Sequence, residues 1–215
     1  MSQAEPQARF ASRSRSTEPA GLAALDRLRD ELASRSRAAL ARPGARAAAV
    51  LVPIVVRPAG LALLCTVRTK TVLEHKGEVS FPGGAVDAGD EDTVRAALRE
   101  TNEELGIAAG AVRVLGMLDD VFTVVSNYII SPVVGVLDRE PSVVPHAAEV
   151  DRPLYVSLAD LVRRGARRYE VRGDGGAAKL VYAYDVGPDT IWGATARITH
   201  ALLKLWRPTA EEVTT

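Results

Sequence analysis

The stretch Phe81–Ile107, FPGGAVDAGDEDTVRAALRETNEELGI, combines a glycine turn with a segment of helical periodicity. Aspartate and glycine are typical helix caps, so we expect a helix that Asp90 caps and Gly106 ends. The residues of its apolar stripe are Val94, Ala97, Leu98, Thr101 and Leu105. The stretch therefore predicts a helix with one buried face, which begins shortly after a Gly-Gly turn.

The same helix carries three carboxylates near its C-terminal end, and Glu100, Glu103 and Glu104 are called the helix glutamates below. Their i, i+3 and i+4 spacing places them on one patch, where the helix dipole disfavours added negative charge. Oxygen ligands gathered without histidine or cysteine suit Mg²⁺ or Mn²⁺. A solvated acidic face is the alternative interpretation. Arg99 favours the metal site, because it reaches Glu103 at i+4 and can hold it in place.

The nine residues that begin at Arg99, RETNEELGI, resemble the second half of the Nudix box, GX5EX7REUXEEXGU. The first half departs from that pattern, since one extra residue separates Gly84 from Arg99. Asp90 or Glu91 can fill the first acidic place of the box, and the sequence leaves the two open. Thr101 takes the place of a bulky apolar residue and still offers a methyl group to the core.

The resemblance implies a metal-dependent hydrolase of a nucleoside diphosphate linked to another group. It assigns the divalent cation, Mg²⁺ or Mn²⁺, to the helix glutamates, with a backbone oxygen of Gly84 as a further ligand. Such ions neutralise a diphosphate and activate water for attack on phosphorus. A general base is also needed, either a box glutamate or a residue of a later loop. Glu149 is the loop candidate, and an exposed loop carboxylate without a role is its alternative interpretation.

Segments around the turn indicate the substrate. LLCTVR, from Leu63, and HKGEVSFPGG, from His75, resemble the extra signature of the coenzyme A diphosphatase branch, LLTxR followed by RxxxGxxxFPGG. The later run IWGATA, from Ile191, also resembles that branch. One element differs, since Leu73 stands where the signature has arginine. The resemblance implies hydrolysis of coenzyme A or acyl-CoA to 3′,5′-ADP and (acyl-)4′-phosphopantetheine.

Candidate substrate-binding residues lie on both sides of the box. Arg68, His75 and Lys76 form a basic group suited to the 3′-phosphate of coenzyme A, and a solvated loop is the alternative. Phe81 and Tyr128 are the aromatic candidates, with Tyr128 placed to stack on a base. The loop after the box contains Asp119, Asp120 and Phe122, which can line the pocket or be purely structural.

Two other functions fit the same motif. One is a Nudix hydrolase of another nucleoside diphosphate derivative, such as ADP-ribose, a dinucleotide or a nucleoside triphosphate. The other is a non-catalytic Nudix-fold ligand sensor, which is expected to lose carboxylates of the box. Because all three helix glutamates are present, we rank the enzyme first.

The rest of the chain predicts an α+β domain with additions at both ends. We expect a disordered N-terminal arm (1–20), an amphipathic N-terminal helix (21–43), the Nudix hydrolase domain (46–207) and a C-terminal tail (208–215). Within the N-terminal region the helical spacing runs over Leu22–Leu40. Strands are expected at Arg46–Val56 paired with Gly60–Arg68, at Val112–Met117, Val121–Leu137 and Leu154–Val156, and at Tyr169–Arg172 paired with Lys179–Tyr184.

Two further helices are expected, Leu158–Arg164 with Ser157 as its cap, and Thr190–Trp206 at the end of the domain. Strands before and after the central helix predict a mixed sheet between helices. The resemblance implies a Nudix-type αβα sandwich, with the catalytic helix following the Gly-Gly turn.

Composition limits the function classes. A chain of 215 residues, 47% hydrophobic and 25% charged, is typical of one globular domain. A formal net charge of zero argues against a nucleic-acid partner held by a broad basic face, and no apolar run is long enough to predict a membrane partner. Cys65 is the only cysteine, so we expect a reducing, cytoplasmic location. The expected partner is a small CoA-like nucleotide, and a homodimer is possible.

Overall fold

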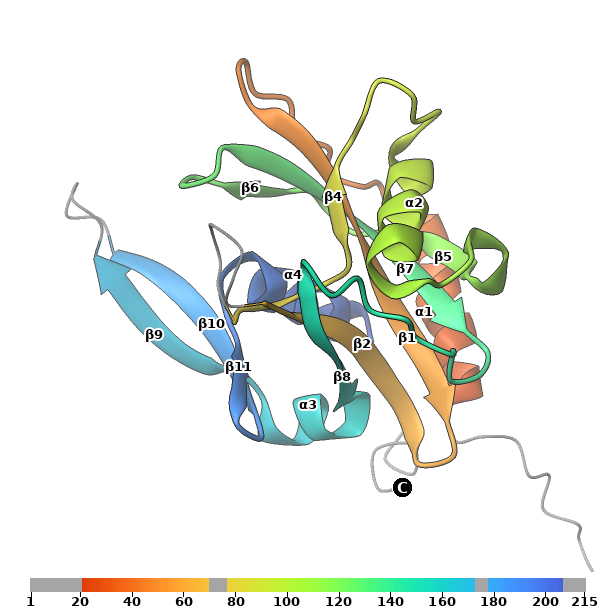
Figure 1. Ribbon diagram of the computed structural model, residues 1–215. Helices are drawn as coiled ribbons and strands as arrows, with labels where there is room; N and C mark the ends of the chain where they lie inside the picture. The colour runs from red at the N-terminus through yellow and green to blue at the C-terminus, as the bar shows by residue number, and fades with distance from the viewer. Residues whose placement is uncertain (1–20, 70–76, 173–177, 207–215) are drawn as a thin grey trace, which may run out of the picture.

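A computed structural model describes residues 21–69, 77–172 and 178–206 (Figure 1). Its central strand is β1 (Arg46–Arg57). It runs parallel to β7 (Tyr128–Leu137) from Arg46↔Tyr128 to Val55↔Leu137, and antiparallel to β2 (Gly60–Arg68). The remaining strands of this eight-stranded sheet are β3 (Val79–Ser80), β4 (Gly83–Ala85), β5 (Arg113–Met117), β6 (Val121–Thr123) and β8 (Val150–Ser157). The expected hairpin and mixed sheet are therefore confirmed.

The large sheet is buried on both faces because β1 is apolar on both sides. Val52 and Ile54 belong to a core cluster that also contains residues of α1 (Leu22–Ser34) and α4 (Gly193–Leu205). Leu51 and Val55 lie in separate clusters with residues of α2 (Thr93–Leu105). Alternate residues of a strand point to opposite faces, so α2 lies on one face and α1 and α4 on the other. This is the predicted αβα sandwich.

A second, three-stranded sheet stands beside the first (Figure 1). It consists of β9 (Arg167–Arg172), β10 (Ala178–Val186) and β11 (Asp189–Ile191), and it follows α3 (Leu158–Arg164). A short 3-10 helix, Ala109–Ala111, links α2 to β5. None of the helices in the described ranges has both the length and the apolar character needed to cross a lipid bilayer.

Three helix boundaries differ from the expectations. Asp92, and not Asp90, caps α2, accepting a hydrogen bond from the Arg95 N–H at 2.8 Å. The first helix ends at Ser34, and the following segment, up to Leu40, is held instead by hydrogen bonds to acidic side chains. The last helix starts at Gly193, since residues 190 and 191 pair with β10 as part of β11. Gly106 ends α2 as predicted, with φ of 69°.

Some expectations fall outside the described residues: the N-terminal arm (1–20), the tail (208–215), the turn between β9 and β10, and the side chains of His75 and Lys76.

Candidate active site

Two adjacent glycines bring strand β4 close to both β1 and α2. Gly83 has φ of 153°, and a Cβ there would lie 2.3 Å from the Ala49 carbonyl oxygen. Gly84 pairs with Ala49 in antiparallel register, and a Cβ there would lie 2.6 Å from the carboxyl carbon of Glu100. Only glycine permits both approaches. The bare turn therefore allows a helix carboxylate to lie directly against backbone.

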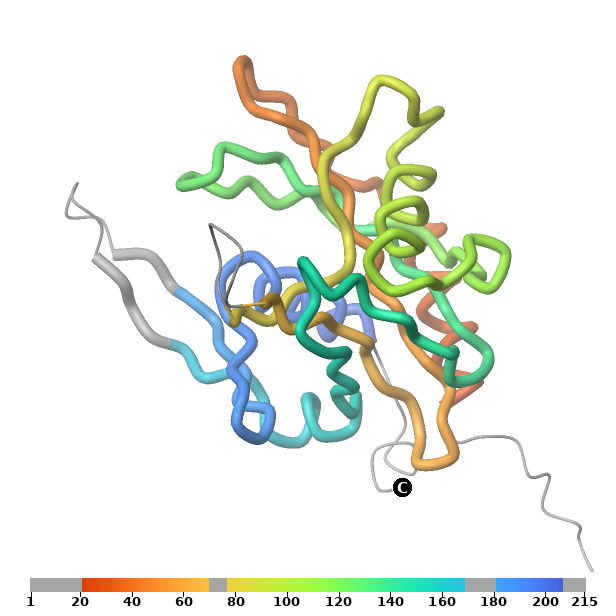
Figure 2. The backbone as a smooth tube through the Cα atoms, viewed as in Figure 1, coloured from red at the N-terminus to blue at the C-terminus, as the bar shows by residue number. Residues whose placement is uncertain are grey.

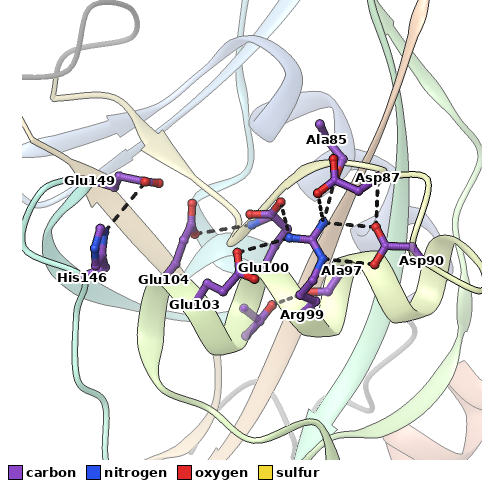
Figure 3. Close-up of polar contacts among 12 residues, drawn as sticks. Ala85, Asp87, Asp90, Ala97, Arg99, Glu100, Glu103, Glu104, His146 and Glu149 are labelled. Atoms are coloured by element: carbon purple, nitrogen blue, oxygen red, sulfur yellow. Dashed lines mark hydrogen bonds and ion pairs between the residues drawn. The ribbon is translucent and has the colours of Figure 1, made fainter.

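Arg99, in the middle of α2, binds acidic groups both before the helix and along it (Figure 3). Its guanidinium donates to both carboxylate oxygens of Asp90 at 3.1 Å, to Glu100 Oε1 at 2.9 Å and to the Ala85 carbonyl at 3.1 Å. The hydrogen bonds from Arg99 to Asp90 hold the pKa of Asp90 below its ordinary value. Glu91 instead lies 3.6 Å from Arg95. By geometry, Asp90 takes the first acidic place that the sequence left open.

The carboxylates of Glu100 and Glu104 are partly shielded from solvent. The Glu104 side chain belongs to a residue that is 4% exposed, and it accepts one long hydrogen bond of 3.4 Å from the Gly83 N–H. Burial raises the pKa of Glu104 to about 7, although the charge of Arg68 opposes the shift. Burial also raises the pKa of Glu100, against the hydrogen bond from Arg99. Desolvation therefore outweighs the positive charge of Arg99 at Glu100 and of Arg68 at Glu104, and perturbed pKa values of this kind are typical of functional sites.

Glu103 departs from the expected patch of three converging carboxylates. It accepts a hydrogen bond from Arg99 at 3.2 Å, and its side chain is 56% exposed. Arg99 thus draws Glu103 along the helix surface, whereas Glu104 turns towards Gly83 (Figure 3). Within the described residues, no three acidic, histidine or cysteine side chains form a ready-made metal cluster.

The remaining donors nevertheless fit a hard divalent cation. Glu100 and Glu104 supply carboxylate oxygens from one helix turn, and Gly84 supplies nearby backbone. Mg²⁺ usually binds through one or two carboxylates, several waters and substrate phosphates. A divalent cation would also favour the ionised form of both carboxylates, which desolvation disfavours. Glu103 would then serve mainly as a partner of Arg99.

The loop before β8 runs past the C-terminal end of α2 (Figure 2). Glu149 is the last residue of that loop. The backbone N–H groups of Val144 and His146 donate to the carbonyls of Leu105 and Glu104 at 2.9 and 2.8 Å. The Glu149 carbonyl accepts from the Thr69 N–H at 3.0 Å. These bonds satisfy open helix carbonyls and anchor the loop on both sides. The half-exposed Glu149 carboxylate lies 3.8 Å from His146 Nδ1, close enough to Glu104 for its charge to contribute to the raised pKa of that group (Figure 3).

Arg68 supplies positive charge on the same side. It is the last residue of β2, and its charge opposes the raised pKa of Glu104. Its Nε atom is buried and has no hydrogen-bond partner among the described residues. A guanidinium beside a carboxylate site is suited to an incoming anion.

Comparison with known proteins gives the family. The NUDIX domain model matches residues 45–170. The chain belongs to the Nudix family. Over 198 residues it is 41% identical to the mouse protein named mitochondrial coenzyme A diphosphatase NUDT8, covering 88% of this chain and 92% of that one. The human protein of the same name is 38% identical over 85% of this chain and 78% of its own length.

A solved Nudix structure supports the same fold. A MutT/nudix family protein from Enterococcus faecalis aligns with a TM-score of 0.51 over 77% of this chain and 63% of that chain, at 14% identity. This Nudix protein is a diphosphatase by family and by its relatives, and it resembles the coenzyme A diphosphatase branch.

The two aromatic residues predicted to bind substrate both have partners within the protein. Phe81 is 3% exposed and packs in the core cluster with α1 and α4, so its ring is not available to a ligand. Tyr128 lies at the start of β7, where the Arg46 guanidinium covers its ring at 4.1 Å. An aromatic residue near a catalytic turn is as common in a core as in a binding site, so sequence alone does not separate the two.

The loop after the box has a structural role in this enzyme. Asp119 pairs with Arg35 at 2.8 Å, and Asp120 pairs with Arg37. Phe122 is covered by a guanidinium 4.3 Å from its centroid. These contacts hold the segment between α1 and β1 in place, which explains why the residues after Ser34 do not continue the helix.

Sequence reasoning missed Asp87 and the Ala85 carbonyl as partners of Arg99. The Asp87 carboxylate lies 3.4 Å from Arg99 Nη2. Ala85 is the last residue of β4 and Asp87 lies between β4 and α2, where the one-residue insertion was the only available signal.

Proposed function

We propose that this enzyme hydrolyses the diphosphate of coenzyme A or acyl-CoA with Mg²⁺ or Mn²⁺, giving 3′,5′-ADP and (acyl-)4′-phosphopantetheine. The observation that carries the reaction is the pair of desolvated carboxylates, Glu100 and Glu104, which lies against the Gly-Gly turn. The choice of coenzyme A is supported by the printed names of the mouse and human relatives. The segments from Leu63 and His75 add to that support, although Leu73 departs from the branch signature.

Each side chain has a distinct part in this proposal. Glu100, Glu104 and the Gly84 backbone oxygen would hold the cation, which neutralises the diphosphate and activates water when it is bound. Arg99 positions Glu100 and Glu103 without touching the substrate. Arg68 lies beside Glu104, so its guanidinium would meet the reacting diphosphate rather than the remote 3′-phosphate. Recognition of the 3′-phosphate is left to His75 and Lys76 in the sequence-based hypothesis.

We propose Glu149 as the general base, because its loop is anchored to the end of α2 and its carboxylate is close enough to Glu104 to raise the pKa of that group. Glu149→Gln should lower kcat by roughly 10²–10⁴-fold and leave KM within a few fold. The measurement is steady-state kinetics with coenzyme A at saturating Mg²⁺. Glu140→Gln is a matched control, since Glu140 is a loop carboxylate paired with Arg57 at 2.9 Å. An unchanged kcat for Glu149→Gln would return proton transfer to a helix glutamate.

The products test the proposed reaction. Incubation of coenzyme A with Mg²⁺ or Mn²⁺ should yield 3′,5′-ADP and 4′-phosphopantetheine by mass spectrometry, and EDTA should abolish both. Cleavage of ADP-ribose but not of coenzyme A would favour the alternative substrate class. Binding of coenzyme A without cleavage by the wild-type protein would favour a ligand sensor.

The domain boundaries, the location and the partners of the protein are also proposals. We propose a catalytic domain over 46–207 preceded by the helix region 21–43, an arm (1–20), and a tail (208–215). We also propose a cytoplasmic location, because Cys65 is the only cysteine of the chain. Cys65 is fully buried, and burial raises the pKa of its thiol to about 12, which fits an inert core cysteine. A homodimer and the absence of nucleic-acid and membrane partners remain predictions from sequence.

A further inference from the structure

The loop before β8 ends in a closed turn that begins at His146. The His146 carbonyl accepts hydrogen bonds from the backbone N–H groups of Glu149 and Val150, both at 2.9 Å. In a turn of this kind, as in a helix, residues three positions apart lie on the same side. The turn therefore holds the side chains of His146 and Glu149 close to each other (Figure 3).

This turn is attached to the catalytic helix on one side and to the end of β2 on the other. The His146 N–H donates to the Glu104 carbonyl at 2.8 Å. Thr69, the residue after β2, donates from its backbone N–H to the Glu149 carbonyl at 3.0 Å and from Oγ1 to the Ala148 carbonyl at 3.1 Å. The backbone of both side chains is thus fixed relative to the carboxylate site.

The Glu149 carboxylate itself is held less firmly than its backbone. Its side chain is 49% exposed, and His146 is its side-chain partner, with Nδ1 3.8 Å from Oε1. Among the residues that the structure describes, no other side chain donates to this carboxylate. A glutamate side chain has considerable rotamer freedom, so a carboxylate without a partner samples many orientations. The imidazole is therefore the group that can restrict the orientation of Glu149.

The contact has the polarity that such a role needs. A neutral imidazole with its proton on Nδ1 donates one hydrogen bond, and a carboxylate has two oxygens that accept. Donation to one oxygen leaves the other free to take a proton from water. A separation of 3.8 Å is longer than a direct hydrogen bond, but catalytic hydrogen bonds are often long in free enzymes and shorten in the substrate complex.

Two other roles for the pair fit the structure less well. The His146 and Glu149 side chains are 56% and 49% exposed, and exposed ion pairs contribute little to stability. A metal site would need further ligands, and the described residues contain no group of three acidic, histidine or cysteine side chains that could hold an ion. The pairing is therefore best explained by its effect on the Glu149 carboxylate.

We propose that His146 is a positioning residue for Glu149, whose carboxylate it orients through Nδ1–H so that the free oxygen faces the attacking water. The inference rests on the proposed hydrolysis and on Glu149 as its general base. It adds a residue that acts only through this base and contacts neither the substrate nor the cation.

The kinetic test uses the full-length protein with coenzyme A at saturating Mg²⁺. His146→Ala should lower kcat by roughly tenfold and leave KM within a few fold, because a misplaced base slows the chemical step and not binding. The melting temperature should stay near that of wild type, since the pair is exposed. In a Glu149→Gln background, His146→Ala should change kcat by less than about twofold, because the group through which it acts is already lost.

Two conservative variants identify the nitrogen that matters. The amide nitrogen of asparagine takes the place of Nδ1, and that of glutamine takes the place of Nε2. His146→Asn should therefore restore most of kcat, whereas His146→Gln should resemble His146→Ala. Equal rates for the two amide variants would contradict a role for Nδ1.

Nuclear magnetic resonance gives a readout that does not depend on turnover. The hydrogen bond that an imidazole makes decides which of its nitrogens carries the proton. In ¹⁵N spectra of the metal-free protein at pH 8, His146 should carry its proton on Nδ1, and Glu149→Ala should move that proton to Nε2. The chain has three histidines, so the His146 signals are assigned by their loss in His146→Asn.

The outcomes separate this inference from the proposed function. A normal kcat for His146→Ala, or an equal loss with and without the Glu149 carboxylate, would overturn the inference and leave the hydrolysis standing. A normal kcat for Glu149→Gln would overturn the base assignment and the inference together. If wild type cleaves another nucleotide instead of coenzyme A, the same double-mutant cycle on that substrate tests the inference. Without any hydrolysis, a proton on Nε2 would overturn the inference too, and a proton on Nδ1 that depends on Glu149 would support the pairing and reject the reaction.

Discussion

Glu104→Gln is expected to stabilise the metal-free protein at pH 8 while lowering turnover by about 10²-fold or more. The ordinary glutamate pKa of 4.5 is raised to about 7 in the folded state, so folding favours the protonated carboxyl. That contribution is complete below pH 4.5 and is lost as pH rises through 7. Ionising this buried carboxylate then costs up to about 3 kcal/mol, which the neutral amide avoids. Catalysis fails because the amide binds a divalent cation weakly.

The measurement is urea unfolding in EDTA from pH 5 to pH 8, together with kcat in Mg²⁺. The free energies of unfolding of wild type and Glu104→Gln should agree near pH 5 and differ increasingly towards pH 8. Glu103→Gln is the matched control, since its exposed carboxylate should change stability by less than about 1 kcal/mol. A Glu104→Gln protein that is less stable than wild type at pH 8 would show that the carboxylate already has a strong partner.

Alanine at the two turn glycines should have opposite consequences. At Gly84 the new Cβ would meet only the movable end of Glu100, at 2.6 Å, so the fold should survive while that carboxylate is displaced. A displacement of about 1 Å lowers turnover by about 10²-fold. At Gly83 the Cβ would meet the Ala49 carbonyl at 2.3 Å in a left-handed conformation, and the free energy of unfolding should fall by about 2–4 kcal/mol.

Thermal melts and kcat of both variants check this contrast. Gly89→Ala is the control, because its Cβ would have no neighbour within 4 Å, and both readouts should stay near wild type. A stable Gly84→Ala enzyme with normal kcat would remove Glu100 from the chemistry.

Local patterns predicted much of the fold. The apolar stripe of α2, its end at Gly106, the β1–β2 hairpin and the ion pair of Arg99 with Glu103 all follow from spacing over a few residues. Caps were harder, because Asp90 and Asp92 have the same capping chemistry. The choice depends on Arg99, which recruits Asp90 from nine positions away.

Features that depend on distant residues could not be predicted. Helical spacing placed the helix glutamates on one face, but competition for Arg99 decided that Glu103 turns away from Glu104. The strand at residues 190 and 191 forms because β10 pairs with it, whereas the apolar spacing alone favoured a helix. Burial of Phe81 likewise depends on α1 and α4, which lie far away in sequence.

The most direct test of the proposed function is the ratio of kcat/KM for coenzyme A to kcat/KM for ADP-ribose at saturating Mg²⁺. Coenzyme A carries a 3′-phosphate that ADP-ribose lacks, and this group should favour the transition state of the preferred substrate. We expect a ratio well above one, by roughly tenfold or more if one charge-assisted hydrogen bond to that phosphate is made. A ratio below one would contradict the substrate assignment and leave a Nudix diphosphatase with a different nucleotide substrate.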